Sequence, residues 1–426
     1  MLSWRLFRTA GFLFLTLLLL GVGTLLHPAP AQTPHDEQPV AERLNTYLAE
    51  ARIEQGAAEL AMALTANPDD DELRFGTGIL QFVGAVENLG QAWYEYGLRS
   101  QGPLIQFVPF LRLPVPPNPK PSTVTHEQSR QVLNQFVADI LLAEETLAQI
   151  SDDDVTLAVY LGRAFLDFDS DGQASPAEAL WQIYAELNRG VQISASQAAD
   201  FLIRFDAGDV QWLRGYCHLL AAMLDFYLAH DDTRLFEHVA HLFFQRPETS
   251  YDFLLIQQPE DWFDGLLSDA IALVHLISLP VIDRDRTAAA LRHLQQVVTL
   301  SHLSWDLYSQ ETDNDHEWIP YPGQTGVIPG ATVTLAMVNQ WQDFLDEASA
   351  ILAGERLLPF WRGTAPVGVN LRRVFTEPHT FDAVRWAQGT AAAPYLESGT
   401  ITDSEFWFRL RDAFDGRFLF FAFWFN

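Results

Sequence analysis

Apolar residues recur every three to four positions along much of this chain, which is the spacing of an amphipathic α-helix. Leu44, Tyr47 and Leu48 share one helical face, and Ala51 follows one turn later. Glycine and proline are sparse in the middle of the chain, so few positions interrupt the pattern. The pattern predicts a mainly α-helical array, with a helix opened by Ser194 and others over Ala57–Leu64, Asp71–Tyr96, Glu127–Ile150, Val210–His230, Thr233–Gln245, Asp261–Leu279, Arg284–Leu307 and Thr332–Leu352.

One segment breaks the helical pattern. Seven prolines lie between Pro103 and Pro121, and proline both lacks a backbone N–H and clashes inside a helix. The segment Gly102–Ser122 is therefore expected to be a stiff, extended connector. It divides N-terminal helical hairpins, residues 32–101, from a longer helical region, residues 123–309.

The pattern changes again after Gln310. A loop of about twenty residues follows, rich in proline and glycine from Pro320 to Gly330, and loops of this length are usually functional or disordered. Residues 310–426 are expected to form a loop-rich region with one long helix. Near its end, Phe418–Phe425 is almost wholly aromatic, which fits a buried strand or a short helix equally well.

The first residues have the pattern of a secretory signal peptide. Arg5 and Arg8 form a basic start, an apolar run from Gly11 to Leu26 follows, and an Ala-Pro-Ala site ends at Ala31. Cleavage after Ala31 would remove residues 1–31, and an uncleaved membrane anchor is the alternative. We expect a secreted or periplasmic protein with no stable membrane insertion after cleavage.

The charge of the chain narrows the classes of partner. It has 55 acidic and 26 basic residues, a formal net charge of −29 at pH 7. Such a surface repels phosphate backbones and anionic lipids, so nucleic acid is not expected as a partner, whereas divalent cations suit it. Lys120 is the only lysine and Cys217 the only cysteine, so disulfides do not stabilise the fold.

The segment from Asp167 to Glu178 follows the calcium-loop pattern D-x-[DN]-x-[DN]-G-x5-E. Carboxylates at alternate positions of a tight loop converge on one point, and Gly172 supplies the φ > 0 conformation that turns the chain. Calcium takes six to eight oxygen ligands, here three aspartates, a backbone carbonyl, a direct or water-bridged hydroxyl and a bidentate glutamate. The expected Ca²⁺ ligands are Asp167, Asp169, Asp171, Gln173, Ser175 and Glu178.

The neighbouring segments suggest helices on both sides of this loop. Val155–Leu166 is predicted to be the incoming helix. Leu180, Ile183, Tyr184 and Leu187 recur at helical spacing and predict the outgoing one. The sequence from Ser175 to Glu178 is also a capping box with proline at the first helical position, which is where the outgoing helix would begin.

Helix, loop and helix together resemble an EF-hand over residues 155–188, so the chain resembles secreted bacterial EF-hand domain-containing proteins. The resemblance implies calcium binding through the six ligands above and implies no catalytic activity. A lone loop favours modest affinity, with calcium as a structural clip or sensor in a binding or scaffold protein that has a protein partner in the envelope. The junction Asn67–Asp70 between two predicted helices resembles tetratricopeptide-type pairs.

The acidic loop after Gln310 offers a different function. If it is extended, Asp313, Asp315 and Glu317 lie on one side and His316 on the other. Three carboxylates could bind a second cation or act as acid and base in hydrolysis. The alternative to the calcium clip is therefore a calcium-dependent secreted hydrolase with its site around Asp313–Trp318, whereas a hydrated acidic loop explains the same residues without chemistry.

Other reactive residue types have ordinary explanations. His238 and His241 are three positions apart on a predicted helix, but no third metal ligand accompanies them. Cys217 and His218 are adjacent, and neighbouring residues on a helix point about 100° apart, so they do not form a nucleophile–base pair. Cys217 is expected to be a small buried thiol.

Overall fold

The computed structural model describes residues 38–101, 104–105, 108–182, 198, 200–256, 262–327, 332–363, 366–414, 416, 418 and 421–422 of the 426-residue chain. The expected signal peptide, residues 1–31, lies outside these ranges. Within them, none of the helices combines the length and the apolar character that a membrane span requires.

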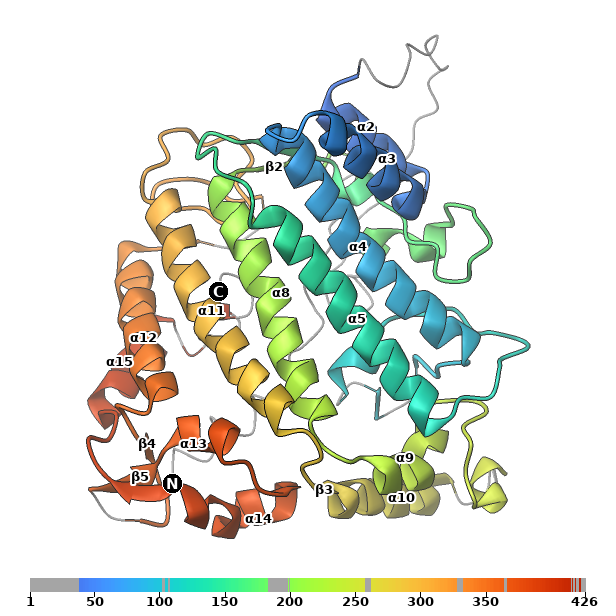
Figure 1. The fold of residues 1–426 in the computed structure, drawn as a ribbon, viewed down its shortest axis with the longest axis vertical. Coiled ribbons are helices and arrows are strands. Elements are labelled where there is room, and N and C mark those ends of the chain that lie inside the picture. Colours follow the sequence, from blue (N-terminus) through green and yellow to red (C-terminus); the bar gives the residue numbers. More distant parts are fainter. Residues whose placement is uncertain are drawn as a thin grey trace.

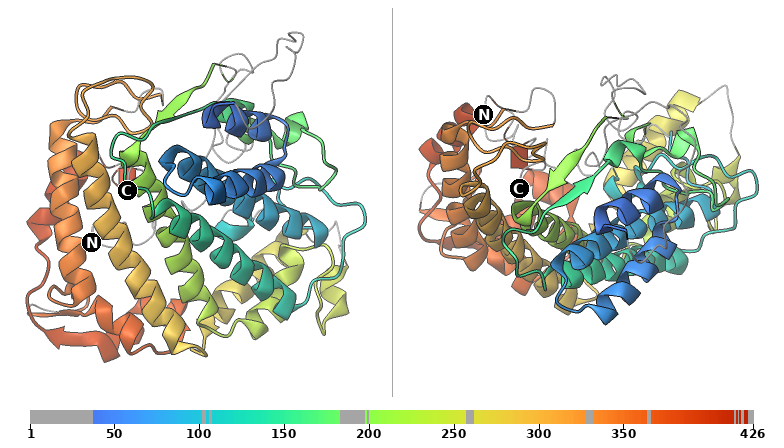
Figure 2. Two further views of the ribbon diagram at one scale, coloured as in Figure 1. Left: turned by 45° about the horizontal axis from the view of Figure 1, so that its top comes forward. Right: turned by 90° about the horizontal axis from the view of Figure 1, so that it is seen from above.

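The body of the molecule is a layer of long helices that lie side by side (Figures 1 and 2). Each helix packs on the next in the order α3, α4, α5, α8, α11, α12. Because α8 lies inside this layer, it buries side chains around most of its circumference. The expectation of a mainly α-helical fold is confirmed, with these helices at Ile53–Ala66, Asp71–Glu95, His126–Leu147, Ala207–Leu228, Arg284–Tyr308 and Leu335–Ala353.

Short polar side chains fix where these helices begin. Thr125 and Gln128 form a reciprocal capping box at the start of α5. Asp206 and Asp209 do the same at the start of α8. Asp70 caps α4 by accepting a hydrogen bond from a backbone N–H of the first turn. These side chains satisfy N–H groups that have no partner within the helix.

The proline-rich connector lies within one continuous packing unit. Helix α4 precedes it and α5 follows it, and the two helices pack directly against each other. A single hydrophobic core extends from Val40 in α2 (Val40–Ala49) to Phe421. Among the described residues of the connector, the one regular element is the short 3₁₀ turn η3 (Pro109–Leu111). The prolines therefore shape a connection between two adjacent helices of the same core.

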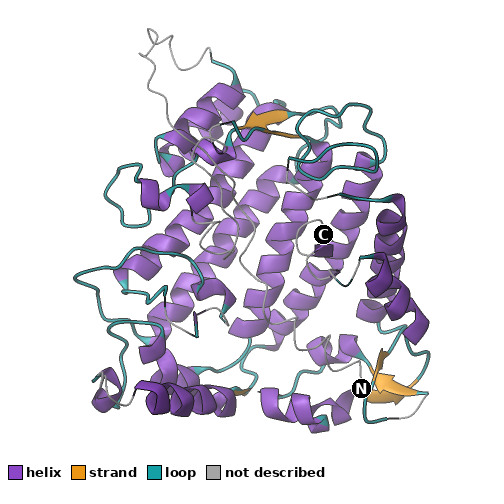
Figure 3. Cartoon of the chain, turned by 180° about the vertical axis from the view of Figure 1, so that it is seen from behind, coloured by secondary structure: helices purple, strands orange, loops and turns teal. Residues whose placement is uncertain are grey.

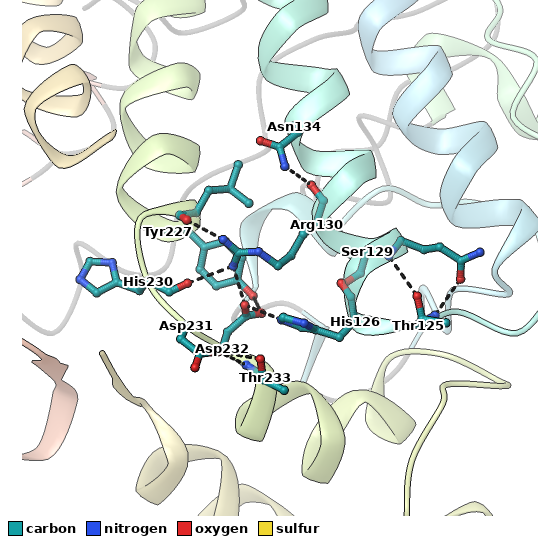
Figure 4. A network of polar contacts seen from close by, with 12 residues as sticks. Thr125, His126, Ser129, Arg130, Asn134, Tyr227, His230, Asp231, Asp232 and Thr233 are labelled. Atoms are coloured by element: carbon teal, nitrogen blue, oxygen red, sulfur yellow. Dashed lines mark hydrogen bonds and ion pairs between the residues drawn. The ribbon is translucent and has the colours of Figure 1, made fainter. Parts of the chain in front are cut away.

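A buried polar network ties the start of α5 to the end of α8 (Figure 4). Oδ1 of Asp232 accepts hydrogen bonds from Nη1 of Arg130 at 2.6 Å and from Nε2 of His126 at 2.8 Å. The hydroxyl of Tyr227 donates to the other carboxylate oxygen. Arg130 also donates to two backbone carbonyls at the end of α8, those of residues 228 and 230. The buried carboxylate of Asp232 is thus compensated by an arginine and two further donors.

The segment 155–166 is not the incoming helix that its sequence suggested. It contains strand β1 (Leu157–Val159) and the 3₁₀ turn η4 (Leu161–Arg163). Strand β1 pairs antiparallel with β2 (Ile203–Phe205), so that Leu157 lies opposite Phe205. Alternate side chains of β1 are buried, as the pleat of a strand requires. The prediction failed because the partner strand lies far along the chain and a local pattern does not reveal it.

Two smaller groups of elements lie mainly along one end of the helical layer, the lower end in Figure 1, and Figure 3 shows that their strands are short. The helix expected over Asp261–Leu279 ends at Leu276, because residues 278–279 pair with residues 381–382. This first group comprises α9 (Thr233–Val239), η6 (Ala240–Leu242), η7 (Asp252–Leu255), α10 (Trp262–Leu276), β3 (Ser278–Leu279), β6 (Phe381–Asp382) and α14 (Ala383–Gln388).

The second group holds a small antiparallel sheet in which residues 367–369 form the central strand, between residues 358–359 and 396–398. Of the aromatic segment near the end of the chain, the described residues include Phe418 and Phe421, which are helical and contact the ring of Trp341 of α12 in tilted and edge-on arrangements. The group comprises β4 (Leu358–Pro359), β5 (Val367–Val369), α13 (Leu371–Thr376), η9 (Thr390–Tyr395), β7 (Leu396–Ser398) and α15 (Ser404–Ala413).

Candidate metal centre

The expected calcium loop is closed at its base by backbone pairing. The N–H of Leu166 donates to the carbonyl of Glu178 at 3.1 Å, and the N–H of Leu180 donates to the carbonyl of Ala164 at 2.9 Å. The 3₁₀ turn η5 (Pro176–Glu178) completes the loop. The base of the loop is therefore a short antiparallel pairing, and the segment before the loop is not the incoming helix of an EF-hand.

Backbone N–H groups inside the loop hold its aspartates in place. The two carboxylate oxygens of Asp167 accept hydrogen bonds from the N–H groups of Asp171, at 3.0 Å, and Gly172, at 2.9 Å. Gly172 has φ +74°, a conformation that glycine adopts without strain. The N–H of Gln173 donates to Oδ1 of Asp171 at 2.8 Å. The glycine thus makes the turn that its position in the sequence pattern predicts.

Three of the expected ligands converge. Asp167, Asp169 and Asp171 each offer one carboxylate oxygen, and these oxygens all lie within 4.8 Å of one another. Calcium binds oxygen at about 2.3–2.6 Å, so oxygens on opposite sides of the ion are about 4.8 Å apart. Asp167 is buried, Asp169 half-buried and Asp171 exposed, which leaves the site open to solvent on one side. Such a set of carboxylate oxygens could hold a metal ion.

The other expected ligands lie around this group. Glu178 is buried, and its Oε1 accepts hydrogen bonds from the N–H groups of Phe168, at 2.9 Å, and Asp169, at 3.2 Å. Burial raises the pKa of Glu178, and the charge of Asp169 adds to the effect while the Ser175 side chain opposes it. The side chain of Gln173 is exposed and donates to Asp171 at 3.2 Å. Glu178 therefore supports the start of the loop and is not part of the three-aspartate group.

The outgoing helix is described only at its first residues. Leu180 and the two residues after it are helical. Residues 183–197 lie outside the described ranges, and with them lie the expected helical positions Ile183, Tyr184 and Leu187 and the capping residue Ser194.

The loop is anchored on α4 by one aromatic side chain. Phe168, between the first two aspartates, is fully buried. It lies so close to Gly90 that a Cβ at that position would be 2.1 Å from its Cδ1 atom. Nε2 of Gln91 donates to the carbonyl of Asp167 at 2.7 Å. The first aspartates are thereby held against a rigid helix.

The sequence interpretation missed one acidic residue of this site. Oε2 of Glu87, on α4, accepts a hydrogen bond from the N–H of Asp167 at 2.8 Å. Burial, with the charges of Asp167 and Glu178, raises the pKa of Glu87 to about 7. The sequence does contain a signal that Glu87 is buried: it lies one turn after Val83, on the apolar side of the helix.

A second acidic group lies where the loop after α11 meets the start of α8. Carboxylate oxygens of Asp206, Glu311 and Glu317 lie within 4.8 Å of one another. Burial raises the pKa of Glu311 to about 9, and the charges of Asp206 and Glu317 contribute. Nearby, the fully buried Asp209 accepts a hydrogen bond from the Tyr308 hydroxyl at 2.9 Å. Burial and the neighbouring carboxylates thus favour the protonated form of Glu311 in this group.

The condition under which Asp313, Asp315 and Glu317 would lie on one side, an extended loop, is not met. His316 has φ +65°, so the chain does not continue as an extended strand whose alternate side chains share a side. Glu317 is buried in the second acidic group, whereas Asp315 is half exposed and forms a 2.7 Å ion pair with Arg204. Trp318, which follows Glu317, is also buried, so this part of the loop packs against the helical core.

His238, His241 and Cys217 do not share a site. Nδ1 of His238 lies 2.8 Å from the backbone carbonyl of Arg234, and Nε2 of His241 lies 3.3 Å from Asp269, so the two rings serve different partners. Cys217 is fully buried, as expected, and burial raises its thiol pKa. No family model, curated protein or solved structure matches this chain.

Proposed function

We propose that this chain binds one calcium ion in the loop from Asp167 to Glu178, where the ion acts as a structural clip in a secreted helical binding or scaffold protein. The observation that carries the proposal is the convergence of the Asp167, Asp169 and Asp171 carboxylates. Such a group is costly without a cation, because neighbouring like charges repel. Burial and the charge of Asp171 accordingly raise the pKa of Asp169.

Calcium would supply two positive charges where these carboxylates meet. The protein side of the site consists of Asp167, Asp169 and Asp171, with Gln173 and Ser175 as further oxygen donors and Glu178 as the buried support. Because Glu87 and Gln91 bind the backbone of Asp167, any ordering of the loop is transmitted to α4. This connection is what makes the ion a clip rather than an isolated surface ligand.

The open side of the site favours modest affinity. Asp171 and Gln173 are exposed, so water competes for the coordination positions on that side. Extracellular calcium modules have dissociation constants of about 10⁻⁴–10⁻³ M. An exported protein with the signal-peptide pattern of residues 1–31 would meet calcium in that range, and a protein partner in the envelope is part of the same proposal.

Calorimetric titration of the EDTA-treated chain with calcium tests this function. The expected result is a single binding event and a rise in thermal stability, which reaches about 2.7 kcal/mol when free calcium is about 100 times Kd. Asp167→Asn and Asp171→Asn should abolish both effects. Asp153→Asn, which removes an exposed carboxylate of the preceding turn, is the matched control and should keep them. Absence of both heat and stabilisation for the unmodified chain would refute the proposal.

A second candidate function is the calcium-dependent hydrolase. It is favoured by one observation, the raised pKa of Glu311 beside the carboxylates of Asp206 and Glu317, because a proton donor next to a charged carboxylate is an acid–base pair. Its site would include Glu317 and not Asp315. Chromogenic ester, glycoside and phosphoester substrates test it with the unmodified chain and Glu311→Gln. Turnover that the variant loses supports a hydrolase, and the absence of turnover with calcium present counts against it.

A further inference from the structure

A row of four ionisable side chains crosses the helical layer between α5, α8 and α11. Nε2 of His218 lies 3.5 Å from Oε1 of Glu144. On the other side of that ring, Nδ1 lies 2.8 Å from Nδ1 of His293. Nε2 of His293 then lies 3.6 Å from Oδ2 of Asp225. The row therefore reads carboxylate, imidazole, imidazole, carboxylate, and its central contact joins α8 to α11.

The number of protons that this row accepts follows from its contacts. The contact between the Nδ1 atoms needs one hydrogen, since one nitrogen donates and the other accepts. If both rings are neutral, the ring that donates this hydrogen turns a bare Nε2 toward a carboxylate. One additional proton gives both outer nitrogens an N–H and keeps the central bond. A further proton would place hydrogens on both Nδ1 atoms, which face each other at 2.8 Å.

We propose that the His218–His293 pair is an acid-sensitive switch, which joins α8 to α11 while it holds at most one positive charge and separates them when it is forced to hold two.

The charged groups around the pair oppose a second positive charge. The carboxylate at one end of the row, Glu144 of α5, also binds Arg214 of α8 at 3.0 Å. The carboxylate at the other end, Asp225 of α8, also binds Arg286 of α11 at 2.7 Å.

Two more charges act from α11 and its start. The positive charge of Arg292 lowers the pKa of His293, and the negative charge of Asp283 raises the pKa of Asp225. Each carboxylate of the row is thus already compensated by an arginine, so two imidazolium rings in contact have no carboxylate free to balance them.

The electrostatics of His293 agree with this geometry. Burial, and then the charge of His218, lowers its pKa from 6.5 to about 4. A protein with such a histidine loses stability as the pH falls, because the unfolded chain takes up a proton that the folded chain refuses. The loss begins near the ordinary histidine pKa and is complete once the pH passes below that of the folded protein.

A proton suits this pair better than a metal ion does. Protein zinc sites use three or four side-chain ligands. Among the described residues, the pair does not belong to any cluster of three or more His, Cys, Asp or Glu side chains whose ligand atoms lie within 4.8 Å of one another. The outer carboxylates bind the far nitrogens of the rings, away from the point where the rings meet.

Urea unfolding of the full chain at several pH values tests the switch, with His293→Gln as the variant and His302→Gln as the control. His302 lies on the same helix and bonds the side chain of Gln342, away from the pair. Between about pH 6.5 and 4, each pH unit should weaken folding of the unmodified chain roughly tenfold more than that of His293→Gln. His302→Gln should behave like the unmodified chain. Equal pH dependence in the unmodified chain and His293→Gln would overturn the proposal.

Ring ¹⁵N chemical shifts of the unmodified protein give a second measurement that does not depend on a variant. One ring of the pair should remain neutral down to about pH 4. Full protonation of both rings at pH 6 in the folded protein would equally overturn the switch.

Discussion

Replacement of Gly90 by alanine should destabilise the fold and weaken calcium binding, although alanine is the better helix former. A Cβ at Gly90 would lie 2.1 Å from Cδ1 and 2.3 Å from Cε1 of Phe168, whereas favourable carbon contacts lie at about 3.5–4.0 Å. Phe168 is fully buried, so any displacement of its ring disturbs the residues that pack around it. Overpacking of this kind costs about 1–3 kcal/mol.

The matched control is Gly84→Ala in the same helix. There the nearest atom to a Cβ would be Cγ2 of Ile53 at 3.4 Å, an ordinary contact. Both variants gain the same helix propensity, about 1 kcal/mol. The difference between them, about 1–3 kcal/mol, therefore isolates the clash with Phe168.

Urea unfolding in EDTA, followed by circular dichroism, measures this difference, and calcium titration measures its effect on the loop. Because Phe168 lies between Asp167 and Asp169, its displacement should lower the calcium affinity of Gly90→Ala and leave that of Gly84→Ala unchanged. Equal stabilities of the two variants would refute the reasoning from packing. A loss of stability without a change in calcium affinity would show that Phe168 does not position the ligands.

Three further predictions concern buried polar groups and use the same urea assay. Asp232→Asn removes the buried charge that faces an arginine and should lower the free energy of unfolding by about 3–5 kcal/mol. The neighbouring Asp231→Asn should lower it by less than about 1 kcal/mol. Similar losses in the two variants would contradict the role of Asp232 in the polar network between α5 and α8. Tyr308→Phe removes the hydroxyl that donates to buried Asp209 and should lower the free energy of unfolding by about 1–3 kcal/mol; a neutral result would mean that the Tyr308 hydroxyl does not stabilise Asp209. Burial and neighbouring carboxylates raise the pKa of Glu311 from 4.5 to about 9, so the stability present at low pH is lost as the pH rises through that range. Glu311→Gln should flatten this part of the profile in EDTA, and an unchanged slope would exclude Glu311 as its source.

The features that the sequence predicted well are those set by neighbouring residues. Helices α4, α5, α8 and α11 follow from apolar spacing, and side chains such as Thr125 and Asp70 mark their first turns. The turn at Gly172 follows from its place in the loop pattern. Each of these needs only a few consecutive residues, because helix periodicity and capping are local.

The features that the sequence did not predict depend on distant partners. Residues 155–166 form a strand because Leu157 meets Phe205. Glu317 joins Asp206 because the backbone at His316 leaves the extended conformation. Glu87 reaches the loop from Asp167 to Glu178 although its own helix ends long before that loop begins. Spacing along the chain contains none of this information, since these contacts are made by tertiary packing.

The buried cysteine gives this protein a reporter of its own motions. Cys217 is the only thiol of the chain, and it is fully buried on α8, next to His218. A thiol reagent reaches its sulfur only after α8 has moved away from its neighbours, so the rate of labelling measures how often the helical layer opens. When reclosure is fast, that rate gives the free energy of opening, as hydrogen exchange does for amides. Labelling with and without calcium, and across pH, would therefore measure how each condition changes the opening of the core in the unmodified protein.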